Sequence, residues 1–127
     1  MKTRKHNATS CKQQQSLSMP GVPLDGTVWY RRGWALSIPE DPGVYLIHDL
    51  RGVLYIGRTG NLLRRFEQHY TSTHSRLLAQ ALAHPVGLTW FSWRTTITPA
   101  EQDELERELV RRFQPPCNQL LYAQKGA

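Results

Sequence analysis

The stretch that decides the fold reads Gly43-Val44-Tyr45 and then, ten positions from tyrosine to tyrosine, Tyr55-Ile56-Gly57. Residues 44–48 and 53–58 are rich in β-forming side chains, and the segment between them contains Gly52. Two such runs joined by a short turn predict an antiparallel β-hairpin. We expect the rest of the domain to be arranged around this hairpin.

Each strand of the hairpin carries one tyrosine on a defined face. Side chains alternate between the two faces of a strand, so Tyr45 shares a face with Ile47. The same alternation places Tyr55 on one face with Val53 and Gly57. Gly57 ends the second strand and, without a side chain, leaves room for a backbone or a ligand to come close.

A helix rich in arginine is predicted directly after the hairpin, from Asn61 to Tyr70. Its apolar stripe consists of Leu62, Leu63, Phe66 and Tyr70. Arg65 and His69 are four residues apart, which places them on one side of the helix at the border of that stripe. Arg64 points the other way, toward solvent.

Three further elements follow along the chain. Ser75 can cap a second helix, and residues 88–95 alternate as a third strand. The last helix begins at a capping box, Thr98 to Glu101, in which Pro99 takes the first helical position. It ends near Phe113, before two prolines.

One carboxylate of the last helix is predicted to face the core. The apolar stripe of this helix spreads over roughly 140° of the helical wheel, and Glu106 falls inside that arc. Glu101, Glu104 and Glu108 lie outside it. Because a bare buried carboxylate is costly, Glu106 needs a cation or hydrogen-bond donors nearby.

Composition indicates a single intracellular domain that binds a polyanion. The 127 residues carry a net charge of +6, which favours nucleic acid first and an anionic membrane second. The sequence contains no run of about 18 apolar residues, so we expect no membrane partner and a cytoplasmic location. The two cysteines show neither a disulfide framework nor metal-ligand spacing.

The chain divides into four segments. Residues 1–26 are predicted to be a flexible basic tail and connector, and residues 122–127 a short C-terminal tail. Residues 27–38 form an aromatic and basic extension, and residues 39–121 the domain proper. The extension is either packed on the domain or a nucleic-acid contact, and packing is favoured because tryptophans usually lie in a core.

These elements carry residue types that suit phosphodiester hydrolysis. The reaction needs a base for water, positive charge on the phosphoryl oxygens, and a metal with its ligand. The candidates are Tyr45, Tyr55, Arg65, His69 and Glu106. Each also has an ordinary structural role: strand tyrosines pack in cores, arginines and histidines lie at surfaces, and Glu106 could pair with an arginine such as Arg65. Spacing alone leaves both interpretations open.

The hairpin motifs are similar to those of a known family. The stretch Pro42-Gly43-Val44-Tyr45 with Leu54-Tyr55-Ile56-Gly57-Arg58 resembles the core of the GIY-YIG nuclease family. Within that family it is similar to the compact domain at the N-terminus of the bacterial excinuclease incision subunit, over roughly residues 39–121. The later motif positions are matched in order by Arg65, His69, Glu106, Pro115 and Asn118.

The resemblance implies an α/β (α+β) fold in which a small three-stranded antiparallel sheet is flanked by helices, in agreement with the elements predicted above. It also implies one divalent metal, Mg²⁺ or Mn²⁺, held by Glu106. By position, Tyr45 would be the general base, assisted by His69. Tyr55 would position the water or the scissile phosphate, and Arg65 would stabilise the transition state.

Contacts with nucleic acid are expected outside these five positions. By the resemblance, Asn118 would brace the site from the segment after the last helix. We assign nucleic-acid binding to Arg58, Arg64, Asn118, Arg31 and Arg32. Arg58 stands where the excinuclease branch often has lysine; it keeps the charge but cannot act as a neutral base.

The sequence therefore predicts a metal-dependent endonuclease that hydrolyses phosphodiester bonds in DNA through a tyrosine-activated water, in DNA repair or in a mobile element. The alternatives are a catalytically silent nucleic-acid-binding module of the same fold and a member that cleaves RNA. Because one chain carries one site, a homodimer is an expected partner for cutting both strands. A targeting protein is the other expected partner.

Overall fold

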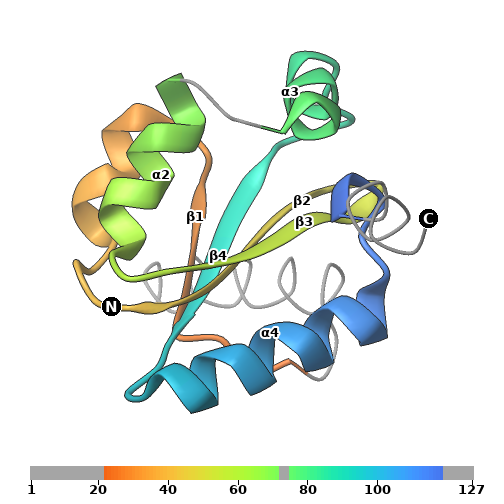
Figure 1. Ribbon diagram of the computed structural model, residues 1–127. Helices are drawn as coiled ribbons and strands as arrows, with labels where there is room; N and C mark the ends of the chain where they lie inside the picture. Colours follow the sequence, from red (N-terminus) through yellow and green to blue (C-terminus); the bar gives the residue numbers. More distant parts are fainter. Residues whose placement is uncertain (1–21, 72–74, 119–127) are drawn as a thin grey trace, which may run out of the picture.

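The computed structural model describes residues 22–71 and 75–118, without the side chains of residues 69–71 (Figure 1). The tail predicted over residues 122–127 and most of the one over residues 1–26 lie outside these ranges. Within them, no helix is long and apolar enough to span a bilayer. The elements are β1 (Gly26–Trp29), the 3-10 helix η1 (Arg32–Ser37), β2 (Gly43–Asp49), β3 (Gly52–Thr59), α2 (Leu62–Thr71), α3 (Arg76–Ala83), β4 (Trp90–Thr95) and α4 (Pro99–Phe113).

The strands form one antiparallel sheet in the order β1-β4-β2-β3. The three predicted strands are present as β2, β3 and β4, with helices around them. A fourth strand, β1, comes from the predicted extension and pairs with β4 from Gly26 opposite Trp93 to Trp29 opposite Trp90. The extension is packed into the domain, because Tyr30 is also buried in the core.

A β-bulge in the hairpin changes which side chains share a face. Ile47 pairs with Tyr55, but the next residue, His48, pairs with Val53, so Leu54 is the extra residue of β3. Tyr55 packs on the same core cluster as Ile47, whereas Val53 belongs to the cluster on the opposite face. The prediction that Tyr55 and Val53 share a face is therefore wrong, because regular alternation does not hold across a bulge.

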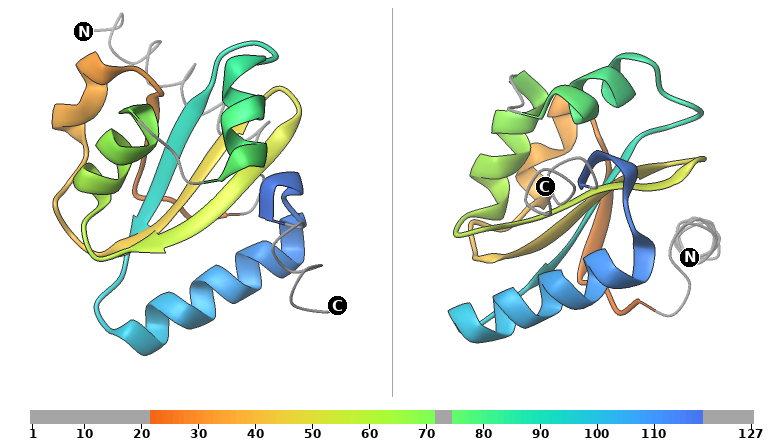
Figure 2. Two further views of the ribbon diagram at one scale, coloured as in Figure 1. Left: turned by 45° about the horizontal axis from the view of Figure 1, so that its top comes forward. Right: turned by 45° about the vertical axis from the view of Figure 1, so that its right-hand side comes forward.

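Helices cover both faces of the sheet (Figures 1 and 2). On the face covered by η1, α2 and α3, Phe66, Leu78 and Phe91 belong to one buried cluster. On the face covered by α4, Leu109 packs in a second cluster with Ile56 of β3. Because β3 is an outer strand, side chains from both layers can meet at its edge.

The first turn of α4 is fastened to the sheet. The first half of the predicted capping box forms: Thr98 Oγ1 accepts a hydrogen bond from the Glu101 backbone N–H at 3.1 Å. The Glu101 carboxylate accepts a hydrogen bond at 2.8 Å from the N–H of Ile97, one residue before the cap. In the next position, the Gln102 amide donates to the carbonyls of Gly43 at 3.1 Å and Thr59 at 2.7 Å. These bonds tie the helix to the start of β2 and the end of β3, so the side chains one turn later face the end of β3.

Candidate active site

The two motif tyrosines lie side by side on the α2 side of the hairpin. Tyr45 is fully buried and Tyr55 is partly buried, and their ring centroids are 6.1 Å apart. Gly57 is the cross-strand neighbour of Tyr45. A Cβ on Gly57 would lie 2.6 Å from Cζ of Tyr45 and closer still to its hydroxyl oxygen. Only glycine therefore lets the Tyr45 ring lie across β3.

Arg65 of α2 reaches the hydroxyl of Tyr45. Its Nη1 donates toward Tyr45 Oη at 3.5 Å, which is a long hydrogen bond. Its Nε is buried and has no hydrogen-bond partner within the described part of the chain. Buried donors normally have a hydrogen-bond acceptor, so this guanidinium N–H beside a hydroxyl is suited to donate to an anionic oxygen.

Burial makes the Tyr45 hydroxyl hard to ionise. Loss of solvent raises its pKa well above the usual value for tyrosine, and the neighbouring Tyr55 hydroxyl raises it further. The positive charge of Arg65 and its hydrogen bond lower the pKa, but by less. Tyr45 is therefore a neutral phenol in this structure, and ionising it requires more positive charge than Arg65 supplies.

Glu106 of α4 faces β3, as the helical wheel predicts. Its carboxylate is 21% exposed and lies 3.6 Å from Nε of Arg58. The sequence suggests Arg65 as a possible partner of Glu106, and the structure shows a pairing with Arg58, the residue after Gly57. A second carboxylate, Asp103, binds Nη1 of the same guanidinium at 2.7 Å. Sequence reasoning missed Asp103, although its spacing of three residues from Glu106 places both on one helix face.

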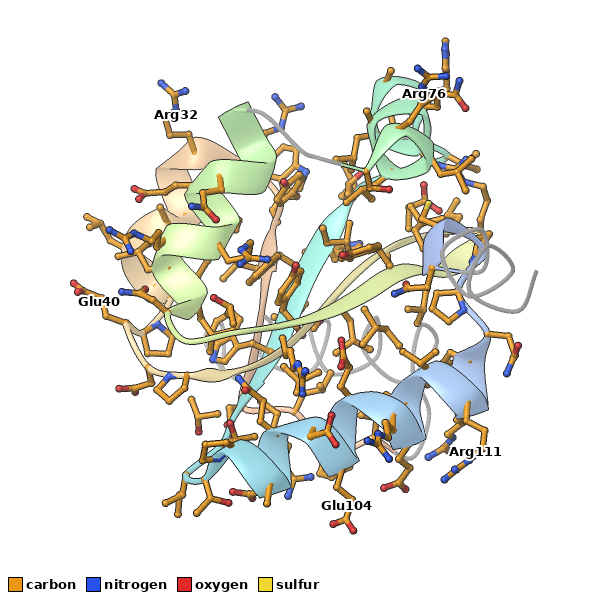
Figure 3. All side chains as sticks on the ribbon, viewed as in Figure 1. Arg32, Glu40, Arg76, Glu104 and Arg111 are labelled. Atoms are coloured by element: carbon orange, nitrogen blue, oxygen red, sulfur yellow. The ribbon has the colours of Figure 1, made fainter. Side chains whose placement is uncertain are left out.

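The tyrosine half and the carboxylate half of the site meet at one point of β3. Gly57 contacts Tyr45 on the face covered by α2. Arg58, the next residue, pairs with Glu106 on the face covered by α4. Because consecutive residues of a strand point to opposite faces, one edge of β3 presents both halves. In Figure 3 this edge runs between α2 and α4.

Asn118 braces the same strand. It is 5% exposed, its Nδ2 donates to the carbonyl of Ile56 and its Oδ1 accepts from the N–H of Ile56, both at 2.9 Å. These bonds satisfy the backbone N–H and carbonyl of Ile56 on the outer edge of β3, within the second tyrosine motif. Its amide is engaged within the protein, in the bracing position that the sequence predicts, and a contact of Asn118 with nucleic acid stays a prediction.

The remaining predicted residues lie around this edge. The backbone of His69 belongs to α2, but its side chain lies outside the described residues. Arg64 is exposed on α2. Arg31 lies over the ring of Trp29, 4.7 Å from its centroid, and Arg32 projects outward from η1 in Figure 3. The structure places these three arginines at the surface.

The carboxylates of α4 suit a hard divalent cation that takes its other ligands from water and substrate. Among the described residues, no group of three or more His, Cys, Asp or Glu side chains could hold a metal ion. Mg²⁺ is commonly bound by one or two carboxylates together with waters and substrate phosphates. Glu106 already attracts a cationic group, Arg58, and Asp103 adds a second carboxylate one turn away. The donor set therefore suits Mg²⁺ or Mn²⁺ bound together with a phosphate substrate.

Comparison with known proteins identifies relatives over most of the described chain. A family model described as "GIY-YIG catalytic domain" matches residues 41–120. UvrABC system protein C of Hydrogenovibrio crunogenus is 32% identical over 92 residues, and that of Zymomonas mobilis is 35% identical over 93 residues. These matches cover 70% and 71% of this chain, but only 14% and 13% of the relatives' length.

The fold is similar to that of a solved nuclease domain. The GIY-YIG N-terminal endonuclease domain of UvrC from Thermotoga maritima, solved bound to magnesium as its catalytic divalent cation, matches with a TM-score of 0.56. The match covers 68% of this chain and 93% of that domain, at 22% sequence identity. At this identity the likeness shows a shared fold, an α+β arrangement with an antiparallel sheet, as the sequence predicts.

Proposed function

Because the chain belongs to the GIY-YIG family, we propose that it is a metal-dependent endonuclease that hydrolyses phosphodiester bonds in DNA. The observation that carries the proposal is the meeting of two half-sites at the Gly57-Arg58 step of β3. One half offers a buried hydroxyl and an unpaired guanidinium N–H. The other offers a carboxylate that already attracts a cation.

Arg65 binds the scissile phosphate in this proposal. Its unpaired Nε and its Nη1, which makes only a long bond to Tyr45, can fork onto two phosphoryl oxygens. A guanidinium placed where negative charge develops stabilises the transition state. Its loss should lower the rate by about a hundredfold or more, which is the typical effect of removing one oxyanion-hole donor.

Tyr45 is the proposed base for the attacking water, and Tyr55 positions the water or the phosphate. The raised pKa of Tyr45 opposes this role, so positive charge has to stabilise the phenolate. Arg65 does so directly through its bond to Oη. His69, one turn further along α2, relays the proton in this proposal.

Glu106 is the proposed metal ligand. When bound there, a divalent cation would neutralise the charge that develops on the leaving oxygen.

Outside the reacting centre, the exposed arginines Arg31, Arg32 and Arg64 contact backbone phosphates. They lie at the start of η1 and on α2, which are side by side in Figure 1. A single site cuts one strand per visit, so a double-strand cut requires a second copy or a second encounter.

The test is cleavage of supercoiled plasmid with Mg²⁺ by wild type, Arg65→Ala and Arg76→Ala. Arg76 is exposed on α3, so its variant removes the same charge away from the site. We expect nicking by wild type and Arg76→Ala, and a loss of about a hundredfold in Arg65→Ala. Salt-sensitive DNA binding without cleavage would identify a silent binding module, and cleavage confined to RNA the RNA-cleaving alternative.

A further inference from the structure

One guanidinium is shared by the two carboxylates of α4. Arg58 binds Asp103 at 2.7 Å through Nη1 and lies 3.6 Å from Glu106 through Nε. The Arg58 side chain is 47% exposed, so it is free to move on the solvent side, whereas that of Glu106 is only 21% exposed. The shorter of the two contacts is to the carboxylate that the family pattern does not require.

Asp103 is held in place independently of Arg58. Its second oxygen, Oδ2, binds Nη2 of Arg107 at 3.0 Å, one turn further along α4. Just before it, Gln102 fastens the helix to the backbone of β2 and β3. Asp103 therefore offers Arg58 a fixed anchor beside Glu106.

We propose that Arg58 competes with the divalent cation for Glu106, and that Asp103 is a positioning residue that retains Arg58 when the cation takes Glu106. This inference rests on the proposed function, in which Glu106 is the metal ligand. A guanidinium and a dication on one carboxylate repel each other, so the weaker contact to Glu106 gives way first. The bond to Asp103 keeps the guanidinium within one helical turn of the metal.

The retained guanidinium then has a task. Nε of Arg58 no longer faces Glu106, and Arg58 adjoins Gly57, over which the Tyr45 hydroxyl lies. The N–H that metal binding releases is thus available to a phosphate oxygen at the edge of β3. Metal loading and phosphate binding would be coupled through one side chain.

The test is a titration of the full, metal-free chain with Mn²⁺ in the absence of DNA. The electron paramagnetic resonance signal of unbound Mn²⁺ reports how much of the ion is bound. Arg58→Gln should bind Mn²⁺ roughly three- to tenfold more tightly, because a competing positive charge is removed next to the ion. Arg111→Gln is the matched control, since Arg111 is exposed on the same helix and points away from the sheet in Figure 3. It should change the affinity less than twofold, by about the effect of a distant screened charge.

A double-mutant cycle separates positioning from direct ligation by Asp103. Asp103→Asn should weaken Mn²⁺ binding when Arg58 is present and have little effect in the Arg58→Gln background. An equal loss in both backgrounds would show that Asp103 binds the metal itself and overturn its positioning role. Unchanged affinity in Arg58→Gln, or the same gain in Arg111→Gln, would overturn the competition.

Glu106→Gln keeps the inference separate from the proposed function. If Glu106→Gln abolishes Mn²⁺ binding and Arg58→Gln leaves it unchanged, only the competition fails. If Glu106→Gln binds Mn²⁺ as wild type does, the metal site of the proposed function fails and the competition fails with it. Circular dichroism of each variant confirms that it is folded before the comparison is made.

Discussion

Substituting Gly57 by alanine probes the tyrosine half of the site without removing a functional group. The added methyl would lie 2.6 Å from Cζ and 2.9 Å from Cε1 of Tyr45, where ordinary contacts begin at 3.4 Å. Restoring 3.4 Å to Cζ requires a shift of about 0.8 Å, the difference of the two distances. The ring cannot move freely, because it stacks on Phe91 at 5.4 Å and lies against Tyr55 at 6.1 Å.

This overlap predicts a large loss of rate and a moderate loss of stability. Forcing an extra methyl into a packed core costs about 1–3 kcal/mol. A displacement of about 1 Å at a reacting group can cost a hundredfold in rate. We therefore expect Gly57→Ala to cleave DNA about a hundredfold more slowly in single-turnover assays, while Mn²⁺ binding at Glu106 is retained.

Gly60→Ala is the matched control. Gly60 lies three residues further along the chain, and a Cβ there would meet no atom within 4 Å. This variant should melt and cleave as wild type does. Assays are run where circular dichroism shows both variants to be folded. If folded Gly57→Ala cleaves at the wild-type rate, the Tyr45 hydroxyl is not at the reacting centre and the assignment of the site is refuted.

Four further variants and the pH dependence of the wild-type rate test separate features of the site and the core. Tyr45→Phe should lower the single-turnover rate by about a hundredfold or more with little change in DNA affinity; a larger loss in Tyr55→Phe would reverse the two roles. Because burial raises the pKa of Tyr45, the wild-type rate should still be rising above pH 8, and a plateau at pH 7 would contradict a tyrosine base. Asn118→Ala leaves the N–H and carbonyl of Ile56 unpaired and should lower the free energy of unfolding by about 2 kcal/mol in denaturant melts. Burial lowers the pKa of His48 from 6.5 to about 4, so the unfolded state binds more protons below pH 6.5. Stability should fall by about 3 kcal/mol from pH 6.5 to pH 4, and His48→Gln should flatten this dependence.

Local chemistry made part of the fold predictable. The capping box at Thr98, with proline after it, is read from adjacent residues, and α4 runs over the predicted range. The inward aim of Glu106 follows from helical periodicity, which depends only on the sequence of that helix. The hairpin around Gly52 is likewise a local signal.

Other features depend on contacts between distant parts of the chain. The four residues of β1 are a strand only because they pair with β4, more than 60 positions away. The bulge at Leu54 is a matter of register between strands, which alternation along one strand does not reveal. Arg58 could be foreseen as a charge near the site, but its pairing with Asp103 arises from the packing of α4 on β3.

The most direct test of the central claim is the Mg²⁺ dependence of plasmid nicking by wild type, Glu106→Ala and Glu104→Ala, with DNA affinity measured in parallel. Glu104 is exposed on the same helix and points to solvent in Figure 3, so its variant removes the same charge away from β3. We expect wild type and Glu104→Ala to nick only with Mg²⁺, and Glu106→Ala to bind DNA without nicking it. Nicking by Glu106→Ala at the wild-type rate would contradict the account, as would the absence of cleavage by wild type on supercoiled, linear, single-stranded and branched DNA.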